Sequence, residues 1–311
     1  MMSSAVPRRP TGPADAAAAI CEVCGEPCRP EPISSRSVLL RCSRCGHLTR
    51  DLKMCPAGAR SEIYGGSEQF DRFRLFFTRR RLLGLLKGLD RQGPLNVLEV
   101  GYGGGQLLEL FQARGHRVFG VEVCPSQGPV VERIRSRGGR LFEQGLDRAE
   151  LPAAAMDLIY LVHVAEHLPD PQAGFQVLSR CARPGALLYL ITPNGRSAGL
   201  RVFGDRWWHL EDPTHRRFFS PSSLRAGLKQ AGFRTLSRRA PLADSLSLEI
   251  NSLLRFFYRQ GAVMDRPLTP WLDLLLMPAA LLARSLWPGL RPNIEVVARR
   301  VDPQDRGESV A

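Results

Sequence analysis

Residues 96–110 read NVLEVGYGGGQLLEL, in which a glycine-rich loop separates an apolar segment from a leucine-rich one. Such a loop can hold a nucleotide cofactor, and the spacing of its glycines indicates which one. The dinucleotide pattern needs glycine at its first, third and sixth positions. From Gly101 the sixth position is Gln106, and from Gly103 it is Leu108, so neither register predicts a dinucleotide.

The loop matches a different pattern, an acid followed by alternate glycines: Glu99, Gly101, Gly103 and Gly105. Glycines lack a Cβ, so the backbone can lie against a cofactor, and a helix beginning near Gly105 offers free N–H groups to a carboxylate. Glu99 would repel a pyrophosphate, but it would attract the sulfonium and ammonium of S-adenosylmethionine (SAM). The loop therefore predicts SAM as the cofactor.

A second acid, Glu122, stands at the end of the apolar segment RVFGVEV. A carboxylate at the end of the second strand can accept hydrogen bonds from both hydroxyls of a ribose. Nicotinamide enzymes use the same arrangement, so Glu122 predicts a ribose without selecting the cofactor. An exposed charge at a strand end is the alternative interpretation.

Four cysteines form two pairs, Cys21-x-x-Cys24 and Cys42-x-x-Cys45, and a glycine follows each pair. Four thiolates from two tight turns are the tetrahedral ligand set of a structural zinc ion. A unit this small depends on its metal for folding. Three further residues nearby could replace a ligand: Cys28, His47 and Cys55. We predict a closed, structural Zn2+ site, with ordinary buried cysteines as the alternative.

The chain has 311 residues and a formal net charge of +13, and nearly all of its positive charge is arginine. Such a charge favours acidic partners such as nucleic acid or an anionic membrane. The arginines are scattered, however, and an arginine-rich genome composition explains them equally well. The N-terminal residues lack the apolar core of a signal peptide, so we expect a cytoplasmic protein with reduced cysteines.

Apolar segments alternate with helical ones after the cysteine region, which predicts a doubly wound, Rossmann-like α/β fold with a parallel sheet. A helix from 221 to 231 is well marked, because Ser220 can cap it and Pro221 suits its first turn. The seven predicted strands are 96–100, 117–121, 140–143, 157–162, 186–192, 233–238 and 294–299. The glycine loop then lies at the carboxyl ends of the strands, where such sheets bind ligands.

The predicted organisation has seven parts. They are a flexible tail (1–18), a zinc ribbon (19–58), a helical connector (59–91), a SAM-binding domain (92–240), a helical insertion (241–292), the last strand (293–302) and a second tail (303–311).

Within the predicted insertion, residues 268–288 are strongly apolar, with tryptophans at both ends, but Asp273, Pro278 and Arg284 interrupt them. We expect helices that cover a pocket or dock on a partner, with peripheral membrane contact as an alternative.

Three segments in order, VLEVGYGGGQLLELFQARGHRVFGVEVCPS, DLIYLVHVAEHLPDP and LLYLITPN, resemble the successive motifs of class I SAM-dependent methyltransferases. The resemblance is greatest to the branch that includes the ubiquinone-biosynthesis O-methyltransferases. The cysteine pairs followed by SEIYGG resemble the zinc-binding head of bacterial relatives in that branch. The likeness covers about residues 21–233 and the last strand.

The resemblance implies roles for individual residues. Glu99 and the loop glycines would hold the methionine end of SAM, and Glu122 the ribose. The loop 145–147 would meet the adenine, and residues 163–167 would line the methyl-transfer face. Relatives carry an acid-x-x-Glu-His cluster there, associated with a divalent ion. This chain has His163 in place of the first acid, which departs from that pattern.

Methyl transfer to a hydroxyl or ammonium benefits from a general base, and histidine is the natural choice. We expect His167 first and His215 second in this role, with His163 beside them on the methyl-transfer face and in contact with the cofactor. Alternatively, His167 caps a helix and His215 anchors its loop by hydrogen bonds. Four further residues could contact the acceptor: Trp207 and Trp208 by stacking, Arg216 and Arg217 by binding an anionic group. Alternatively, the two tryptophans form the internal packing of the lid over the pocket.

The sequence thus predicts a SAM-dependent methyltransferase acting on oxygen, carbon or nitrogen of a small-molecule acceptor. A nucleic-acid or protein methyltransferase is less favoured, because the loop N/D-P-P-Y/F of many amino-methylating enzymes is missing. A non-catalytic SAM-binding zinc scaffold is the third hypothesis. The acceptor, the methylated atom and the oligomeric state stay open.

Overall fold

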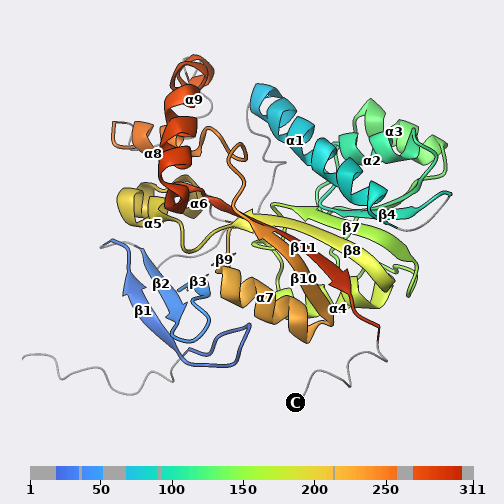
Figure 1. The fold of residues 1–311 in the computed structure, drawn as a ribbon, viewed down its shortest axis with the longest axis horizontal. Helices are drawn as coiled ribbons and strands as arrows, with labels where there is room; N and C mark the ends of the chain where they lie inside the picture. The colour runs from blue at the N-terminus through green and yellow to red at the C-terminus, as the bar shows by residue number, and fades with distance from the viewer. Residues whose placement is uncertain are drawn as a thin grey trace, which may run out of the picture.

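The computed structural model describes residues 19–34, 37–51, 68–89, 93–212, 214–257 and 269–302. These residues form a large sheet covered by helices and a smaller sheet beside it (Figure 1). Several predicted segments lie outside the described residues: the two tails, residues 52–67 between ribbon and connector, and residues 258–268 of the insertion.

The large sheet has seven strands in the order β10-β11-β8-β7-β4-β5-β6. Their bounds are β4 Asn96–Val100, β5 Arg117–Val121, β6 Arg140–Phe142, β7 Met156–Val162, β8 Ala182–Pro193, β10 Phe233–Arg239 and β11 Asn293–Arg300. All seven predicted strands are present, within a few residues of their predicted bounds. The order confirms the predicted doubly wound fold, because the chain starts in the middle of the sheet and winds outward both ways.

The prediction of a wholly parallel sheet is wrong for one strand. β11 lies between β8 and β10 and is antiparallel to both. The reason is the path of residues 240–292, which leave β10 at the carboxyl end of the sheet and return at that same end. A strand that begins there must run in the opposite direction, and antiparallel neighbours need no crossover.

Helices cover both faces of the large sheet (Figure 1). On one face α1 (Glu68–Lys87), α2 (Gln106–Gln112) and α3 (Pro129–Ser136) pack against alternate strand residues such as Val97 and Leu158. On the other face α4 (Pro171–Cys181) and α7 (Pro221–Gln230) pack against Leu98 and Ile159. The central strands are mainly apolar because both their faces are buried.

The predicted cap of α7 is confirmed. The Ser220 side chain accepts a hydrogen bond from the Ser223 N–H at 2.9 Å, and the Ser223 hydroxyl accepts one from the Ser220 N–H at 2.9 Å, which completes a capping box.

The smaller sheet joins the cysteine region to the rest of the chain. Its strands are β1 Cys28–Pro32, β2 Val38–Cys42, β3 Leu48–Arg50 and β9 Arg217–Phe218, in that order. β9 follows the fifth strand of the large sheet, more than 160 residues after β3. The ribbon is therefore attached by main-chain hydrogen bonds to the segment that follows β8 of the large sheet.

The remaining helices lie at the carboxyl end of the large sheet (Figure 1). They are α5 Ala198–Phe203, η1 Gly204–Arg206, α6 Trp208–Glu211, α8 Leu248–Leu254, α9 Thr269–Leu286 and η3 Pro288–Leu290. Within the described ranges, no helix combines the length and apolar character needed to cross a bilayer.

Candidate functional site

A cavity of about 890 Å³ opens at the carboxyl ends of β4, β5 and β7. The glycine loop, the end of β5 and the segment 144–147 line one half of the cavity. The segments 163–170, 208–212, 214–216 and 243–247 line the other half, which we call the acceptor half because the sequence predicts the methyl acceptor there, and α1 contributes Arg74 and Thr78. The volume suits a nucleoside cofactor together with a second small molecule.

The glycine loop has the backbone shape that its spacing predicts. Gly101, Gly103 and Gly105 have φ angles of +80°, +49° and +78°, a region that other residues avoid. A Cβ on Gly101 would collide with the Val164 side chain, whereas a Cβ on Gly103 would meet no atom within 4 Å. A side chain at position 101 would therefore clash with Val164, whereas the lack of a side chain at Gly103 leaves space in the cavity for a ligand.

Glu99 lies at the floor of the cavity and is buried. Its Oε2 accepts a hydrogen bond from the Tyr160 hydroxyl at 2.9 Å. Burial raises the pKa of Glu99 to about 8, the charge of Glu122 adds to this, and the Tyr160 hydrogen bond opposes it. A cation in the cavity would stabilise the ionised form. Glu99 thus fits a positively charged ligand and disfavours a pyrophosphate.

Glu122 ends β5 beside the same loop. Its Oε2 accepts the Gly103 N–H at 3.0 Å and its Oε1 accepts the Cys124 N–H at 3.0 Å. Each carboxylate oxygen keeps a further lone pair, and the residue lines the cavity. Glu122 is therefore held rigidly in an orientation that can accept two ribose hydroxyls. The predicted adenine segment, 145–147, lines the cavity as well, with Leu146 buried.

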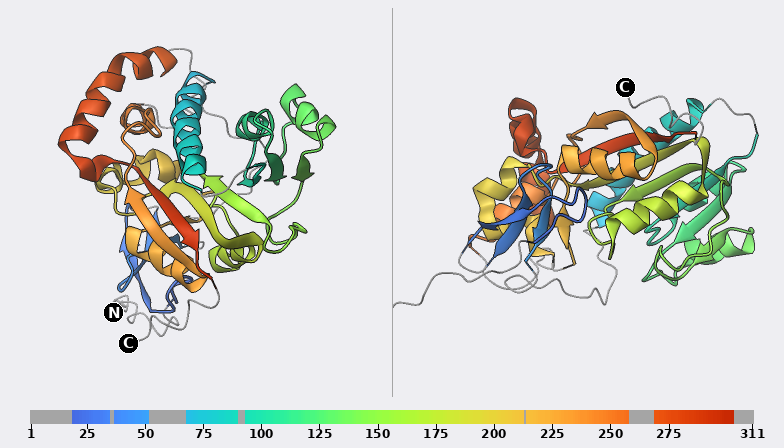
Figure 2. Two further views of the ribbon diagram at one scale, coloured as in Figure 1. Left: turned by 45° about the vertical axis from the view of Figure 1, so that its right-hand side comes forward. Right: turned by 90° about the horizontal axis from the view of Figure 1, so that it is seen from below.

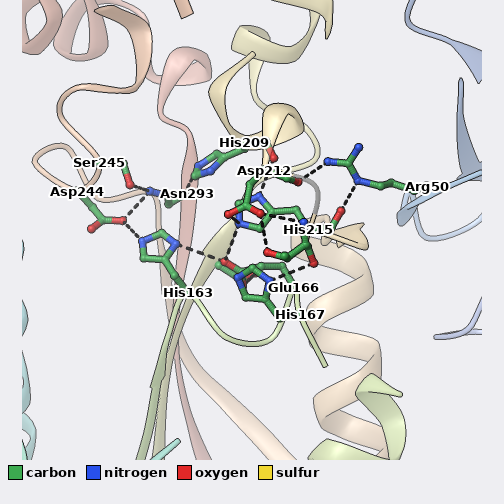
Figure 3. Close-up of polar contacts among 12 residues, drawn as sticks. Arg50, His163, Glu166, His167, His209, Asp212, His215, Asp244, Ser245 and Asn293 are labelled. Carbon is green, nitrogen blue, oxygen red and sulfur yellow. Dashed lines mark hydrogen bonds and ion pairs between the residues drawn. The ribbon is translucent and has the colours of Figure 1, made fainter. Parts of the chain in front are cut away.

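His163 follows β7 and has a φ of +56°, which turns its side chain toward the acceptor half (Figure 3). Its Nε2 lies 3.1 Å from Asp244 Oδ2 and its Nδ1 lies 3.5 Å from Glu166 Oε1. Burial would lower the pKa of His163, but the two carboxylates outweigh burial and raise it to about 9. Both nitrogens of this imidazole thus carry protons near neutral pH.

His167 and His215 come from different loops and lie with ring centroids 4.8 Å apart. His167 Nδ1 is 3.1 Å from the Thr214 carbonyl, and His215 Nδ1 is 2.6 Å from the His209 carbonyl. Because a carbonyl can only accept, each histidine donates from Nδ1 and keeps a lone pair on Nε2. Burial and the neighbouring His167 lower the pKa of His215 to about 4.

The anchoring hydrogen bond that the alternative interpretation predicts is therefore present for His215. The alternative prediction that His167 caps a helix is wrong, because Asp170 caps α4 and His167 instead binds the Thr214 carbonyl. These hydrogen bonds to carbonyls hold both rings in place. They do not exclude a chemical role, because they leave Nε2 of both rings available.

Glu166 lies beneath these two histidines and is fully buried. Its Oε2 accepts the Thr192 hydroxyl at 2.9 Å, but its Oε1 has no hydrogen-bond partner among the described residues. Donor atoms of Glu166, His167 and His215 all lie within 4.8 Å of one another. Two imidazoles and a carboxylate are a donor set that divalent transition metals accept. The cluster can hold either a proton or a metal ion.

The loop that carries His215 is fixed by a residue of the ribbon (Figure 3). Arg50, at the end of β3, donates hydrogen bonds to the carbonyls of His215, Leu210 at 2.5 Å and Asp212 at 2.6 Å. Arg50 and Asp244 were not among the predicted site residues. Both act through contacts with segments far away in the sequence, so no local pattern marks them.

Two of the four predicted acceptor contacts are wrong. Arg217 is buried and pairs with Glu22 at 2.6 Å, so it joins the ribbon to the large domain and does not face the cavity. Trp207 is fully buried and packs against Phe218. Arg216 and Trp208 do line the cavity.

The four predicted metal-binding cysteines lie together in the ribbon, on the side that packs against the large domain. The Sγ atoms of Cys21 and Cys45 are 3.6 Å apart, and Cys24 Sγ lies 3.4 Å from that of Cys42 and 3.5 Å from that of Cys45. Four sulfurs bound to one zinc ion are about 3.8 Å apart. Gly25 and Gly46 have φ angles of +74° and +69°, which close the two turns. The cysteines therefore fit a single tetrahedral ion.

Comparisons with known proteins identify the family of this chain. Residues 70–238, more than half of the chain, match the family described as "Methyltransferase domain". The chain is 29% identical over 173 residues to a ubiquinone biosynthesis O-methyltransferase of Cereibacter sphaeroides, covering 51% of this chain and 70% of that protein. It is 28% identical over 197 residues to one of Maricaulis maris, covering 57% and 73%.

Among solved structures, the fold is similar to that of geranyl diphosphate C-methyltransferase from Streptomyces coelicolor A3(2). The TM-score is 0.51 at 16% identity, and the match covers 79% of this chain and 88% of that one. The chain belongs to the methyltransferase-domain family and is a class I SAM-dependent methyltransferase.

Proposed function

We propose that this enzyme transfers the methyl group of SAM to a hydroxyl oxygen of a small-molecule acceptor. The observation that carries the proposal is the pair of imidazole Nε2 lone pairs, on His167 and His215, in the acceptor half of the cavity. Relatives named ubiquinone biosynthesis O-methyltransferase support oxygen as the methylated atom.

In this proposal the two halves of the cavity have separate tasks. SAM supplies a methyl group already activated by its sulfonium, so the protein mainly has to align donor and acceptor. Glu99 pairs with the cations of the cofactor, the loop glycines admit its methionine end, and Glu122 binds its ribose hydroxyls.

His167 Nε2 accepts the proton of the acceptor hydroxyl, and buried Glu166 stabilises the imidazolium that results. His215 is a poor base. Its pKa of about 4 means that the ring is neutral near neutral pH and binds a proton only weakly. His163 keeps its proton between Asp244 and Glu166 and presents a fixed positive charge. Its predicted catalytic role is therefore electrostatic in this proposal.

A divalent metal ion is the second candidate for activating the hydroxyl. Glu166 Oε1, which makes an ion pair with His163 but no hydrogen bond among the described residues, and the two Nε2 atoms favour the metal ion, because they form a three-donor set. Removal of metal by a chelator separates the two mechanisms. With a histidine base, activity survives dialysis against EDTA, whereas a metal-dependent enzyme loses activity and regains it with Mn2+ or Co2+.

We also propose that the four cysteines bind one structural zinc ion. The ligand set is closed, so the ion contributes to stability and has no position for substrate. The double variant Cys24→Ser, Cys45→Ser should lose one equivalent of zinc and lower the Tm. Unchanged metal content, measured by mass spectrometry of the purified protein, would contradict this assignment.

The proposed reaction is tested with methyl-labelled SAM and a panel of phenols, primary amines and compounds with activated methylene carbons. We expect label on phenolic oxygen and none on nitrogen or carbon. Label on RNA or on a protein substrate would instead favour the polymer methyltransferase. Binding of cofactor without transfer to any acceptor would favour the non-catalytic scaffold.

A further inference from the structure

The outer face of α9 is apolar and open to solvent. Its large exposed side chains have helical spacing, three, four or seven residues apart, so they lie along one side of the helix. An amphipathic helix buries such a side against a binding partner. The exposed side chains are Trp271, Leu274, Leu275, Leu282, Leu286 and Trp287. Exposed fractions reach 71% for Trp271, 73% for Leu275 and 77% for Leu286. Single exposed leucines are ordinary on protein surfaces, but a continuous row of this kind marks an interaction site.

The opposite face of α9 is firmly attached to the body of the protein. Arg284 is fully buried there and pairs with Glu249 of α8 at 2.6 Å and 2.8 Å. It also donates to the carbonyls of Asp244 at 2.7 Å and Ser245 at 2.6 Å. The exposed row is therefore a fixed feature of the surface, and it is tied to the segment 243–247 that lines the cavity.

The place of α9 in the fold leaves this row free among the described residues. In the left view of Figure 2, α9 curves along the outer edge of the molecule, away from the large sheet. The exposed Phe256 and Phe257 follow α8, which packs beside α9. We define the α9 face by the six α9 residues above and leave out these two phenylalanines, of which Phe256 packs against Arg206.

Two observations indicate what covers the α9 face. Trp271 and Trp287 stand at its two ends, about 24 Å apart along the helix, and tryptophan prefers the boundary between lipid and water. The chain carries a net charge of +13, and the exposed Arg201 lies on α5, which packs against α8. An anionic surface is complementary to this charge, whereas a second copy of the chain would be repelled.

We propose that the α9 face docks on anionic lipid bilayers, with α9 lying in the plane of the headgroups. Apolar side chains on one face and a positive protein behind them are the properties of helices that bind at this interface. The proposal does not rest on the methyl acceptor, because lipid binding is measured without methyl transfer. It places the acceptor half of the cavity close to the membrane.

The test uses sedimentation of the full-length protein with two kinds of vesicle. We expect binding to equal parts of phosphatidylglycerol and phosphatidylcholine, and at least tenfold weaker binding to phosphatidylcholine alone. Brominated lipids in the first vesicles should quench tryptophan fluorescence. Leu275→Glu should weaken binding about tenfold, because it puts a charge into the centre of the α9 face.

Leu236→Glu is the matched control, because Leu236 is an exposed leucine of β10, 44% exposed, that does not belong to the α9 face. It should bind vesicles as the unchanged protein does. Both variants should bind S-adenosylhomocysteine normally, which shows that they are folded. Three results would overturn the proposal: no binding to the anionic vesicles, equal binding by Leu275→Glu and its control, or a dimer in solution that Leu275→Glu dissociates.

Discussion

The two halves of the cavity are built in different ways. The cofactor half comes mainly from one stretch of chain between Glu99 and Glu122, with residues 144–147 beside it, and its key features are backbone angles and two carboxylates at strand ends. The acceptor half combines loops after β7, β8 and β10 with Arg50 from the ribbon. Its shape depends on side-chain hydrogen bonds between segments far apart in the sequence.

This difference indicates how the enzyme separates its tasks. A rigid strand-end loop suits a cofactor that is always the same, whereas an assembly of loops can change its acceptor without disturbing the cofactor. Substitutions in one half should therefore leave the other half nearly unaffected. The following predictions test that independence.

The largest effect should come from Gly103→Arg. The position has a φ of +49° and open space toward the cavity, so the arginine would fill the place of the cofactor. We expect S-adenosylhomocysteine binding to fall below detection in calorimetry, with the fold retained by circular dichroism. Gly115→Arg is the control, since Gly115 has a φ of +80° and open space but lies between α2 and β5, outside the cavity lining. Equal loss in both variants would mean that strain, not the cavity, explains the effect.

His167→Asn should affect only the acceptor half. Loss of a general base lowers kcat by about 10²-fold or more, while the Kd of S-adenosylhomocysteine should change less than about twofold. The control is His116→Asn. His116 accepts the Leu95 N–H at the amino end of the strands, opposite the end where the cavity lies, and it does not line the cavity. A large loss of cofactor binding in His167→Asn would disprove the independence of the two halves.

Arg50→Met tests whether the ribbon positions the acceptor loop. Removing the guanidinium frees the carbonyls of Leu210, Asp212 and His215, so the loop should lose its fixed conformation. We expect about a tenfold loss in kcat/KM for the acceptor, equivalent to 1.4 kcal/mol, and an unchanged Kd for S-adenosylhomocysteine. Arg50→Lys should restore part of the activity.

Arg41→Met serves as the control for Arg50→Met, because Arg41 pairs with Glu31 on the ribbon surface and touches no cavity loop. If both variants lost activity equally, general destabilisation of the ribbon would account for the result and the positioning role of Arg50 would be rejected.

The smallest effect should be a pH dependence of cofactor binding. The pKa of Glu99 is raised to about 8, so below this pH the free enzyme holds a proton that must leave before Glu99 can pair with a cation. Affinity for the sulfonium-bearing SAM should rise with pH up to about 8, by at most tenfold per unit. Glu99→Gln should bind more weakly and show a flatter profile. A steep profile in that variant would assign the proton to another group.

The sequence predicted the cofactor half much better than the acceptor half, for a physical reason. Glycine spacing and strand-end acids are local features, so the loop from Glu99 to Gly105 and the positions of the strands could be predicted directly. Arg50 lies 165 residues from the His215 carbonyl that it binds, and no pattern in either segment reveals the contact. For the same reason Arg217 was predicted in the cavity, although Glu22 of the ribbon holds it elsewhere.

The strand β11 was predicted in position but not in direction. Apolar periodicity identifies a strand. The direction of that strand depends on the end of the sheet at which the chain returns from the preceding helices, and the packing of the insertion decides this. The exposed α9 face was visible as an apolar segment, but only the structure separates its buried side at Arg284 from its open side at Leu275.

The most direct test of the account is a calorimetric titration of the purified protein with S-adenosylhomocysteine and, separately, with NADH. We predict saturable one-to-one binding of S-adenosylhomocysteine and no binding of NADH, because the loop lacks the glycine that the dinucleotide pattern needs at its sixth position and Glu99, when ionised, repels a pyrophosphate. Binding of NADH with equal or higher affinity would contradict the assignment of the loop, and with it the proposed reaction.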